Sequence, residues 1–151
     1  MSDQISTRVR HAALSDLAAI HGLLVDLGYA HLSRDALADV LDALLRDDTR
    51  GVWLADVETE VVGLLTTTVR SQLRLAGLEM TVEELVVREH VRGRGVGRAL
   101  LDRAKAEARR LGVLRVQLTT NRTRDVYVRG FYPKNGFVEA PSAVMRWSPE
   151  T

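Results

Sequence analysis

The most informative stretch of the chain leads from a predicted strand into a predicted helix and reads Val86-Val87-Arg88-Glu89-His90-Val91-Arg92-Gly93-Arg94-Gly95-Val96-Gly97-Arg98. Three glycines fall within five positions, although glycine lowers helix stability. Glycine lets the backbone approach a ligand closely, and the first turn of a helix offers unpaired N–H groups at the positive end of its dipole. Four arginines lie in the same stretch. The stretch therefore predicts an anion site, and the expected anion is a pyrophosphate.

Two other phosphate-binding loops do not fit this stretch. The dinucleotide fingerprint G-x-G-x-x-G, counted from Gly93, requires a glycine where Arg98 stands. The Walker loop G-x-x-x-x-G-K-[ST] does not occur in the chain. A purely structural alternative is a glycine-softened helix start with solvated arginines. The clustering of glycines with arginines favours the anion site over that alternative.

The surrounding residues predict alternating helices and strands. Apolar residues at three- and four-residue spacing predict helices over 14–27, 33–45 and 95–111, and a shorter helix is expected over 125–134. Runs rich in valine, leucine and threonine predict strands over 5–10, 51–57, 60–69, 78–87 and 113–120, with a closing strand or hairpin over 136–147. Ser33 is expected to cap the second helix, and Gly28 and Gly112 are expected to end the first and third.

The order of these elements predicts an α/β fold. The strands at 51–57 and 60–69 form a hairpin, and 78–87 is expected to pair antiparallel with the second of them. Residues 78–120 form a strand, a helix and a strand, so a right-handed crossover should make those two strands parallel. The result is a mixed sheet with helices on both faces. The chain has 151 residues, which fits a single domain over 1–151.

Composition excludes several classes of protein. The 21 basic and 20 acidic residues nearly cancel, which argues against a nucleic-acid binder. Without cysteine the chain has no disulfide, thiolate metal site or cysteine nucleophile, and its four histidines lack the spacing of metal ligands. No apolar run approaches the roughly 20 residues that span a bilayer, and the first ten residues lack a signal-peptide core. We therefore expect a soluble, cytoplasmic protein with no metal and no nucleic-acid or membrane partner.

Two motifs give the chain a resemblance to a known family. The run from Arg92 to Gly97 matches the [QR]-x-x-G-x-[GA] motif of the GNAT superfamily of acetyl-coenzyme A-dependent N-acetyltransferases, and Phe131 to Phe137 reads F-Y-x-x-x-G-F. The resemblance extends over nearly the whole chain. It implies a GNAT-like fold, in which a mixed, mostly antiparallel sheet carries helices on both faces and a central parallel strand pair. Members often form homodimers, so a homodimer is a possible assembly.

The resemblance also implies where acetyl-CoA, the co-substrate, would bind. The pantetheine arm would bond the backbone of strand 78–87, and the pyrophosphate would meet the glycine-rich turn. Asp125 stands where many members have an asparagine that holds the pantetheine, and Asn121 is the candidate upstream of it. The coenzyme-binding residues implied in this way are Leu85, Val86, Val87, Arg92, Gly93, Arg94, Gly95, Val96, Gly97, Arg98 and Asn121.

Acetyl transfer to an amine needs a base and an acid. The resemblance implies Tyr132 as the proton donor to the departing thiolate, with Tyr127 as the weaker alternative and a plain core aromatic as the other interpretation. Glu84 or Glu83 is the candidate base, and because they are adjacent in a strand only one should face the amine. Glu79 and Glu83 share a face and should offer an acidic surface to a cationic substrate. Otherwise these glutamates are exposed or paired with arginines, and water or the substrate alone serves as base.

The predicted activity is transfer of the acetyl group of acetyl-CoA to a primary amine by direct attack in a ternary complex. The absence of cysteine excludes a cysteinyl acetyl-enzyme. A small-molecule amine is the expected acceptor, because the chain has no added segment for docking a protein. Two alternatives stay open: acetylation of a protein lysine or N-terminus, and a non-catalytic regulatory module that binds coenzyme A.

Overall fold

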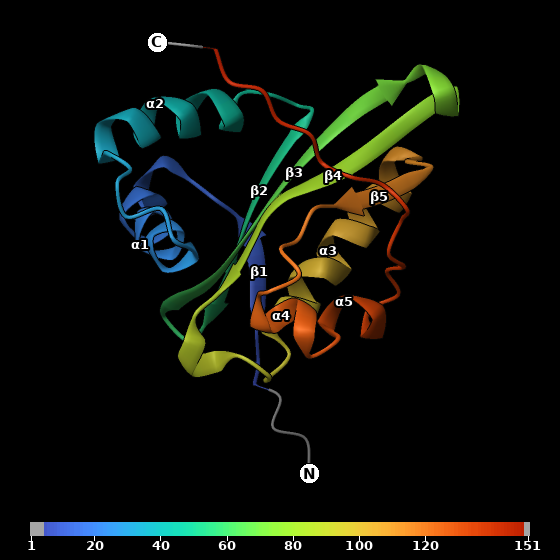
Figure 1. The fold of residues 1–151 in the computed structure, drawn as a ribbon. Helices are drawn as coiled ribbons and strands as arrows, with labels where there is room; N and C mark the ends of the chain where they lie inside the picture. The colour runs from blue at the N-terminus through green and yellow to red at the C-terminus, as the bar shows by residue number, and fades with distance from the viewer. Residues whose placement is uncertain (1–4, 150–151) are drawn as a thin grey trace. The chain divides into compact units, whose positions relative to one another are not determined.

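The computed structural model describes residues 5–149, so the two ends of the predicted domain, 1–4 and 150–151, lie outside the described residues. The chain divides into two compact units, one up to Thr119 and one from Thr120. The first unit holds a sheet and three helices (Figure 1). Its elements are β1 (Arg8–His11), α1 (Leu17–Leu27), α2 (Arg34–Leu45), β2 (Arg50–Val57), β3 (Glu60–Gln72), β4 (Gly77–Val87), α3 (Val96–Leu111) and β5 (Arg115–Leu118).

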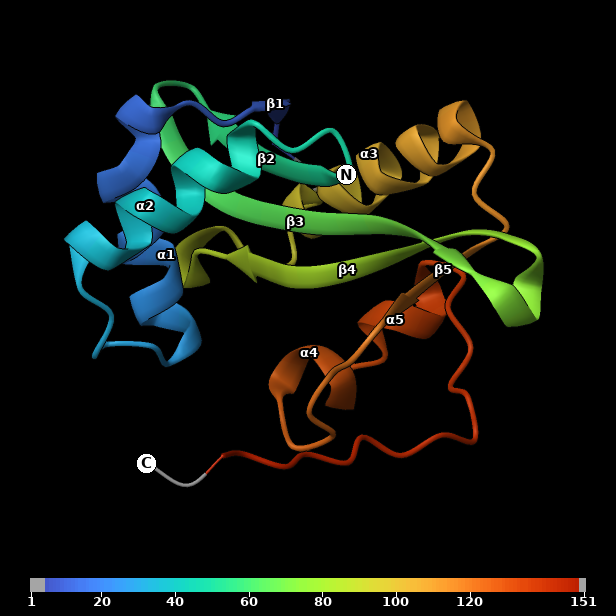
Figure 2. The same cartoon turned by 90° about the horizontal axis from the view of Figure 1, so that it is seen from above.

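The sheet has the strand order β1-β2-β3-β4-β5 (Figure 2). Neighbouring strands are antiparallel except β4 and β5, which are parallel, as the predicted strand–helix–strand crossover requires. The mixed, mostly antiparallel sheet is thus confirmed. The parallel pair is not central, however, because β5 is the last strand of the sheet within residues 5–149.

Helices cover both faces of the sheet, as predicted, and each face has its own apolar core (Figure 1). On one face α1 and α2 pack against side chains of β2, β3 and β4; the buried residues there include Ile20, Leu23, Leu24, Leu41, Val52, Leu54, Leu64 and Val86. On the other face α3 packs against the opposite side chains of the same strands, with buried Leu65, Met80, Val82, Leu100 and Ala104. None of the helices within residues 5–149 has the length and apolar character needed to cross a bilayer.

The predicted helix boundaries are close to those observed in this unit. Ser33 caps α2, because its hydroxyl oxygen accepts a hydrogen bond from the N–H of Ala36 at 3.0 Å. Gly28 and Gly112 end α1 and α3 in the left-handed conformation. The predicted first helix is shorter than expected, since Leu14–Asp16 form a 3-10 turn before α1 begins.

The second unit contains two short helices, α4 (Asp125–Val128) and α5 (Phe131–Lys134). The prediction of one helix over 125–134 is wrong because Gly130, at φ 74°, turns the chain between them. The predicted closing strand over 136–147 is also absent from the described residues. Pro141 removes a backbone donor there, and Val138, Met145 and Trp147 are 85–92% exposed, so no packing favours a strand.

Candidate active site

The carboxyl end of β4 has a strand on one side only. β3 pairs with β4 as far as Val87, whereas β5 pairs with it only over Glu79–Val82. Within the described chain, no strand of the sheet therefore adjoins the other edge of Leu85, Val86 and Val87. Alternate N–H and C=O groups of a strand point to each edge. Some backbone groups of this predicted coenzyme-binding segment therefore point to an edge that no strand covers, although the carbonyl oxygen of Val87 accepts a hydrogen bond from Arg92 Nε.

The glycine-rich turn follows directly from this open end. A 3-10 turn over Glu89–Val91 leads to Gly93 at φ 76° and Gly95 at φ 93°, and α3 begins at Val96. These left-handed conformations explain why glycine stands at both positions. No heavy atom lies within 4 Å of where a Cβ on Gly93 would be, so the turn faces open space. The first N–H group of α3 with a carbonyl acceptor one turn earlier is that of Ala99, which donates to Gly95. The N–H groups of Val96, Gly97 and Arg98 therefore have no acceptor within the helix, and such groups suit an anion.

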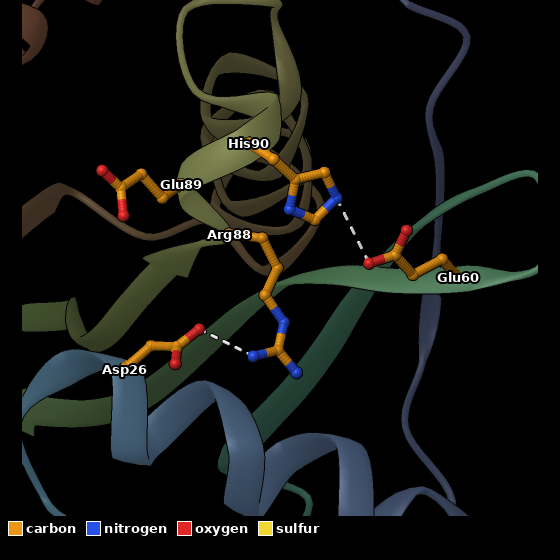
Figure 3. Close-up of a pocket in the computed structure, with 5 residues that line it drawn as sticks. All are labelled: Asp26, Glu60, Arg88, Glu89 and His90. Atoms are coloured by element: carbon orange, nitrogen blue, oxygen red, sulfur yellow. Dashed lines mark hydrogen bonds and ion pairs between the residues drawn. The ribbon is translucent and has the colours of Figure 1, made fainter.

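One of the four arginines of the stretch, Arg88, is engaged away from the turn. Arg88 donates from Nη1 to Asp26 Oδ2 of α1 at 2.7 Å, and it lines a hollow of about 600 Å³ with Asp26, Glu60, Glu89 and His90 (Figure 3). In this hollow His90 Nε2 lies 3.2 Å from Glu60 Oε1, and Glu89 lies apart from both pairs. Arg88 therefore ties the end of β4 to α1 instead of adding positive charge at the turn.

Two other arginines of the turn also have partners. Arg92 donates from Nε to the carbonyl oxygen of Val87 at 3.1 Å, so it braces the turn against the end of β4. Arg98 lies 3.9 Å from Asp102, one helical turn further along α3, with both side chains exposed. Such an exposed pair is weak, so Arg98 is available to a phosphate.

The acidic pair Glu83 and Glu84 lies at a β-bulge. Thr66 of β3 pairs with Glu84 and Thr67 pairs with Val82, so Glu83 is an extra residue on β4. The hydroxyl of Thr66 donates to the Glu84 carboxylate, and the hydroxyl of Thr68 donates to Glu83 Oε1 at 3.1 Å. Thr66 and Thr68 share one face of β3, so both carboxylates lie on that face. The expectation that the two glutamates point to opposite faces is wrong because the bulge breaks the alternation.

The surroundings of Glu84 shift the pKa of its carboxyl. Burial raises the pKa of the Glu84 carboxyl above its ordinary value, the negative charge of Glu83 raises it further, and the positive charge of Arg50 lowers it. A carboxylate with a raised pKa is a stronger base once it is ionised. Glu84 has the partly buried position that this role needs, while Glu83 is exposed.

Glu79 does not form an acidic surface with Glu83, contrary to expectation. Its side chain is fully buried, and Glu79 Oε2 accepts from Arg115 Nε of β5 at 2.7 Å. Gln72 donates to its other oxygen at 3.3 Å, and Arg70 lies 3.9 Å away. Its charge is thus matched inside the sheet, and Glu79 holds β5 to β4 where those strands pair.

Tyr132, the candidate acid, lies in the second unit at α5. Its ring makes edge-on contacts with Phe131 and Phe137, at centroid distances of 5.3 and 6.2 Å. Burial raises the pKa of the Tyr132 phenol, while a hydrogen bond with Thr120 and the charge of Arg124 lower it. The phenol therefore keeps its proton at neutral pH. The hydroxyl of Tyr127 donates to Glu139 Oε2 at 2.8 Å, which leaves Tyr127 the weaker candidate.

Asn121, also in the second unit, is engaged in a local turn. Its side-chain oxygen accepts from the N–H and the hydroxyl of Thr123, at 2.9 and 2.7 Å. Asp125, which stands at the family's asparagine position, pairs with Arg129 at 3.2 Å. A coenzyme contact of Asn121 stays a prediction.

The residues at the end of β4 fit the pantetheine arm and the pyrophosphate of coenzyme A. The open edge of Leu85–Val87 suits an extended polar arm, and the unobstructed turn at Gly93–Arg98 suits a pyrophosphate. Among residues 5–149, no three histidine, aspartate or glutamate side chains are grouped to hold a metal ion. Arg50, Thr66 and Thr68 surround the acidic pair but were not predicted, because only the strand register brings them there.

Three comparisons place the chain among known proteins. Residues 15–137 match the sequence profile of a family described as the acetyltransferase (GNAT) family. The aminoalkylphosphonate N-acetyltransferase of Salmonella typhimurium strain LT2 is 32% identical over 133 residues, which cover 87% of this chain and 85% of that protein.

Solved structures have the same fold. A transcriptional regulator from Bacillus halodurans C-125 superimposes with a TM-score of 0.86 at 25% identity, over 95% of this chain and 99% of that one. An acetyltransferase from Trypanosoma brucei gives a TM-score of 0.78 at 26% identity, over 95% of this chain and 100% of that one.

Proposed function

The chain belongs to the acetyltransferase (GNAT) family, and from this premise we propose that it transfers the acetyl group of acetyl-CoA to the primary amine of a small molecule. The amine attacks directly within a ternary complex. One observation carries the proposal: a partly buried glutamate, an unpaired strand edge and a glycine-rich helix start follow one another along residues 84–98.

The chain's own residues hold acetyl-CoA in this proposal. The backbone of Leu85, Val86 and Val87 bonds the pantetheine arm, and the turn from Arg92 to Arg98 takes the pyrophosphate on its N–H groups. Asn121 is a further candidate for the arm. When bound, acetyl-CoA supplies an acetyl group activated as a thioester, and a backbone N–H at Val86 or Val87 stabilises the negative charge that develops on its oxygen.

Glu84 removes the proton that blocks attack by the amine. A lysine-like amine with a pKa near 10.4 is only about 0.04% neutral at pH 7, which is equivalent to about 4–5 kcal/mol if deprotonation precedes attack. The Glu84 carboxylate, directly or through one water, accepts this proton, and Thr66 fixes its orientation through a hydrogen bond. Glu83 adds negative charge that attracts a cationic amine to the same face of the sheet.

Tyr132 supplies a proton to the departing thiolate. Its raised pKa keeps the phenol protonated until that negative charge develops. We expect Tyr132→Phe to lower kcat by at least about tenfold while the KM for acetyl-CoA changes little, since the ring and its packing are retained.

The acceptor is a small-molecule amine in this proposal. The relative with 32% identity acts on aminoalkylphosphonates, and the alignment covers most of both chains. Acetylation of a protein lysine or N-terminus is the alternative acceptor class, and a non-catalytic module that binds coenzyme A is the alternative outside enzymes.

Thiol release from acetyl-CoA tests these alternatives. The panel contains aminoalkylphosphonates, amino acids, polyamines, aminoglycosides and a lysine-containing peptide, with wild type and Tyr132→Phe measured side by side. Tyr127→Phe is the matched control, and its activity should stay near wild type. Binding of coenzyme A without thiol release from any amine would refute the enzymatic proposal in favour of a regulatory module.

A further inference from the structure

Arg50, the first residue of β2, carries a buried group without a partner. Its Nε–H group is buried and donates to no acceptor among residues 5–149, and no ion pair of those residues includes its guanidinium. Other half-buried arginines are matched: Arg10 bonds Asp16 and Asp56, and Arg115 bonds Glu79. A buried N–H donor left without an acceptor is unfavourable, and a ligand that supplies an acceptor removes that cost.

A second unpaired group lies in the same row of the sheet. Arg50 pairs in register with Thr68 of β3, which pairs with Thr81 of β4. The hydroxyl of Thr81 is also buried without a hydrogen-bond partner in the described part of the chain. Side chains directly opposite one another across a sheet share a face, so both groups lie on the face of the acidic pair.

The row containing Arg50 adjoins the row that holds the candidate base. Thr66, two residues before Thr68 on β3, pairs with Glu84. Two residues along a strand span roughly 7 Å, which is the scale of a small molecule with its hydrogen bonds at each end. The charge of Arg50 acts on Glu84 at this range, because it lowers the pKa of that carboxyl.

We infer that Arg50 and Thr81 form an anion subsite for the acceptor, so that the amine acetylated next to Glu84 carries an acidic group. This inference rests on the proposed function. A guanidinium bonds a phosphonate or a carboxylate through two parallel N–H donors, and the threonine hydroxyl donates to a remaining oxygen. The amino end of the same molecule then lies toward Glu83 and Glu84. The acceptor class is therefore a zwitterionic aminoalkyl acid.

Matched acceptors test the subsite on the wild-type enzyme. 2-Aminoethylphosphonate, β-alanine and ethylamine share the aminoethyl group and differ only in bearing a phosphonate, a carboxylate or no acid. We expect at least one of the two acids to have a kcat/KM at least about tenfold above that of ethylamine, as a charge-assisted contact implies. The ratio between the two acids identifies which anion the site prefers. Equal kcat/KM values for all three amines would overturn the inference.

Arg50→Gln tests the residue itself. We expect the KM of the preferred acid to rise by about 10- to 100-fold, while kcat/KM for ethylamine stays within about twofold. Measurements are made on the alkaline plateau of activity, because removing the charge of Arg50 also raises the pKa of Glu84. Arg50→Lys should recover part of the loss. Arg109→Gln, an exposed arginine near the end of α3, is the control, and the KM for acetyl-CoA and the melting temperature report on folding.

The outcomes separate this inference from the proposed function. Equal loss with the acid and with ethylamine in Arg50→Gln would refute the subsite and leave the acetyltransferase intact. If the wild type acetylates none of these amines, the proposed function fails for this class. Calorimetric binding of ethylphosphonate, which has no amine, then tests the subsite alone. Binding to wild type and loss in Arg50→Gln would support it, and no binding to wild type would overturn it.

Discussion

The carboxyl end and the middle of β4 have different backbone surroundings. At its carboxyl end the strand loses its neighbour beyond Val82 and runs into a turn with two left-handed glycines. At its middle the strand keeps both flanking strands up to a bulge, and there the side chains of Glu83 and Glu84 reach one face. In the proposed function, the first region presents backbone N–H groups to an anion, and the second presents carboxylates to a cation.

This difference separates two ways in which a sequence encodes a site. The turn is encoded by residues that follow one another in the chain, because glycine is strongly favoured at its positions with positive φ. The acidic face depends on β2 and β3, whose residues stand 15 or more positions away in the chain. Substitutions that disable one region while sparing the other therefore test whether the two roles are separate.

Glu84→Gln should have the largest effect and should break the acidic region alone. We expect kcat to fall by about 100-fold or more, because the neutral amide cannot accept the proton of the amine. The KM for acetyl-CoA should change little, since the turn is untouched. Steady-state kinetics at several pH values checks this, and the acidic limb of the pH profile should disappear. A drop below threefold in kcat would assign the base to Glu83 or to water.

The same variant should be more stable than wild type at neutral pH. Burial raises the pKa of Glu84 in the folded state, so its ionised form destabilises the fold above that pKa. Removing the charge removes this penalty. The gain in melting temperature should be present at pH 8 and should vanish as the pH falls below the ordinary glutamate value. A loss of activity together with a lower melting temperature would instead indicate that the variant misfolds.

Gly93→Ala should break the anion region alone, with a smaller effect. A Cβ at φ 76° strains the turn, and we expect the KM for acetyl-CoA to rise by about tenfold, as for loss of one or two backbone contacts. Gly112→Ala is the matched control at the other end of α3. Its φ is 72°, and a Cβ at either glycine would meet no heavy atom within 4 Å.

Both glycine variants should lose similar stability, because both force alanine into the left-handed region. Only Gly93→Ala should weaken acetyl-CoA binding. Thermal denaturation and acetyl-CoA kinetics measured on the pair distinguish strain from ligand contact. An equal rise of KM in both variants would assign the effect to α3 as a whole.

Glu83→Gln should give the smallest effect, and it tests whether the charge of Glu83 acts on the pKa of Glu84. The charge of Glu83 raises the pKa of Glu84. Removing it should move the acidic limb of the pH–kcat profile to lower pH by less than about one unit. Arg50→Gln should move the same limb to higher pH. Shifts in the same direction for both variants would show that the limb belongs to another group.

Sequence patterns within a few residues predict most helices and strands of the first unit. They fail where the structure depends on residues far apart in the chain. Ser33, Gly28 and Gly112 set helix ends through contacts within a few residues, so their roles were predictable. The bulge at Glu83 was not, because it depends on how β3 and β4 align. Nor was the burial of Glu79, which follows from the position of Arg115 on a strand beyond a whole helix.

The second unit was predicted less well for a related reason. Apolar residues over 136–147 suit a strand by composition, but a strand forms only where another edge pairs with it. The sequence predicts Gly130 within a single helix, although its left-handed conformation separates α4 from α5. Tyr132 was chosen from its family motif, and no local pattern distinguishes it from an ordinary core aromatic.

The bulge at Glu83 has a consequence for the length of the chain. Val82 faces the α3 core and Glu84 faces Thr66, so these two residues would alternate correctly even as direct neighbours. β4 therefore carries one residue more than its pairing with β3 requires. That surplus residue falls between the segment held by β5 and the segment left open for a ligand. The bulge therefore separates the part of β4 that pairs with β5 from the part proposed to bind coenzyme A, and the core residues on either side of it keep their faces.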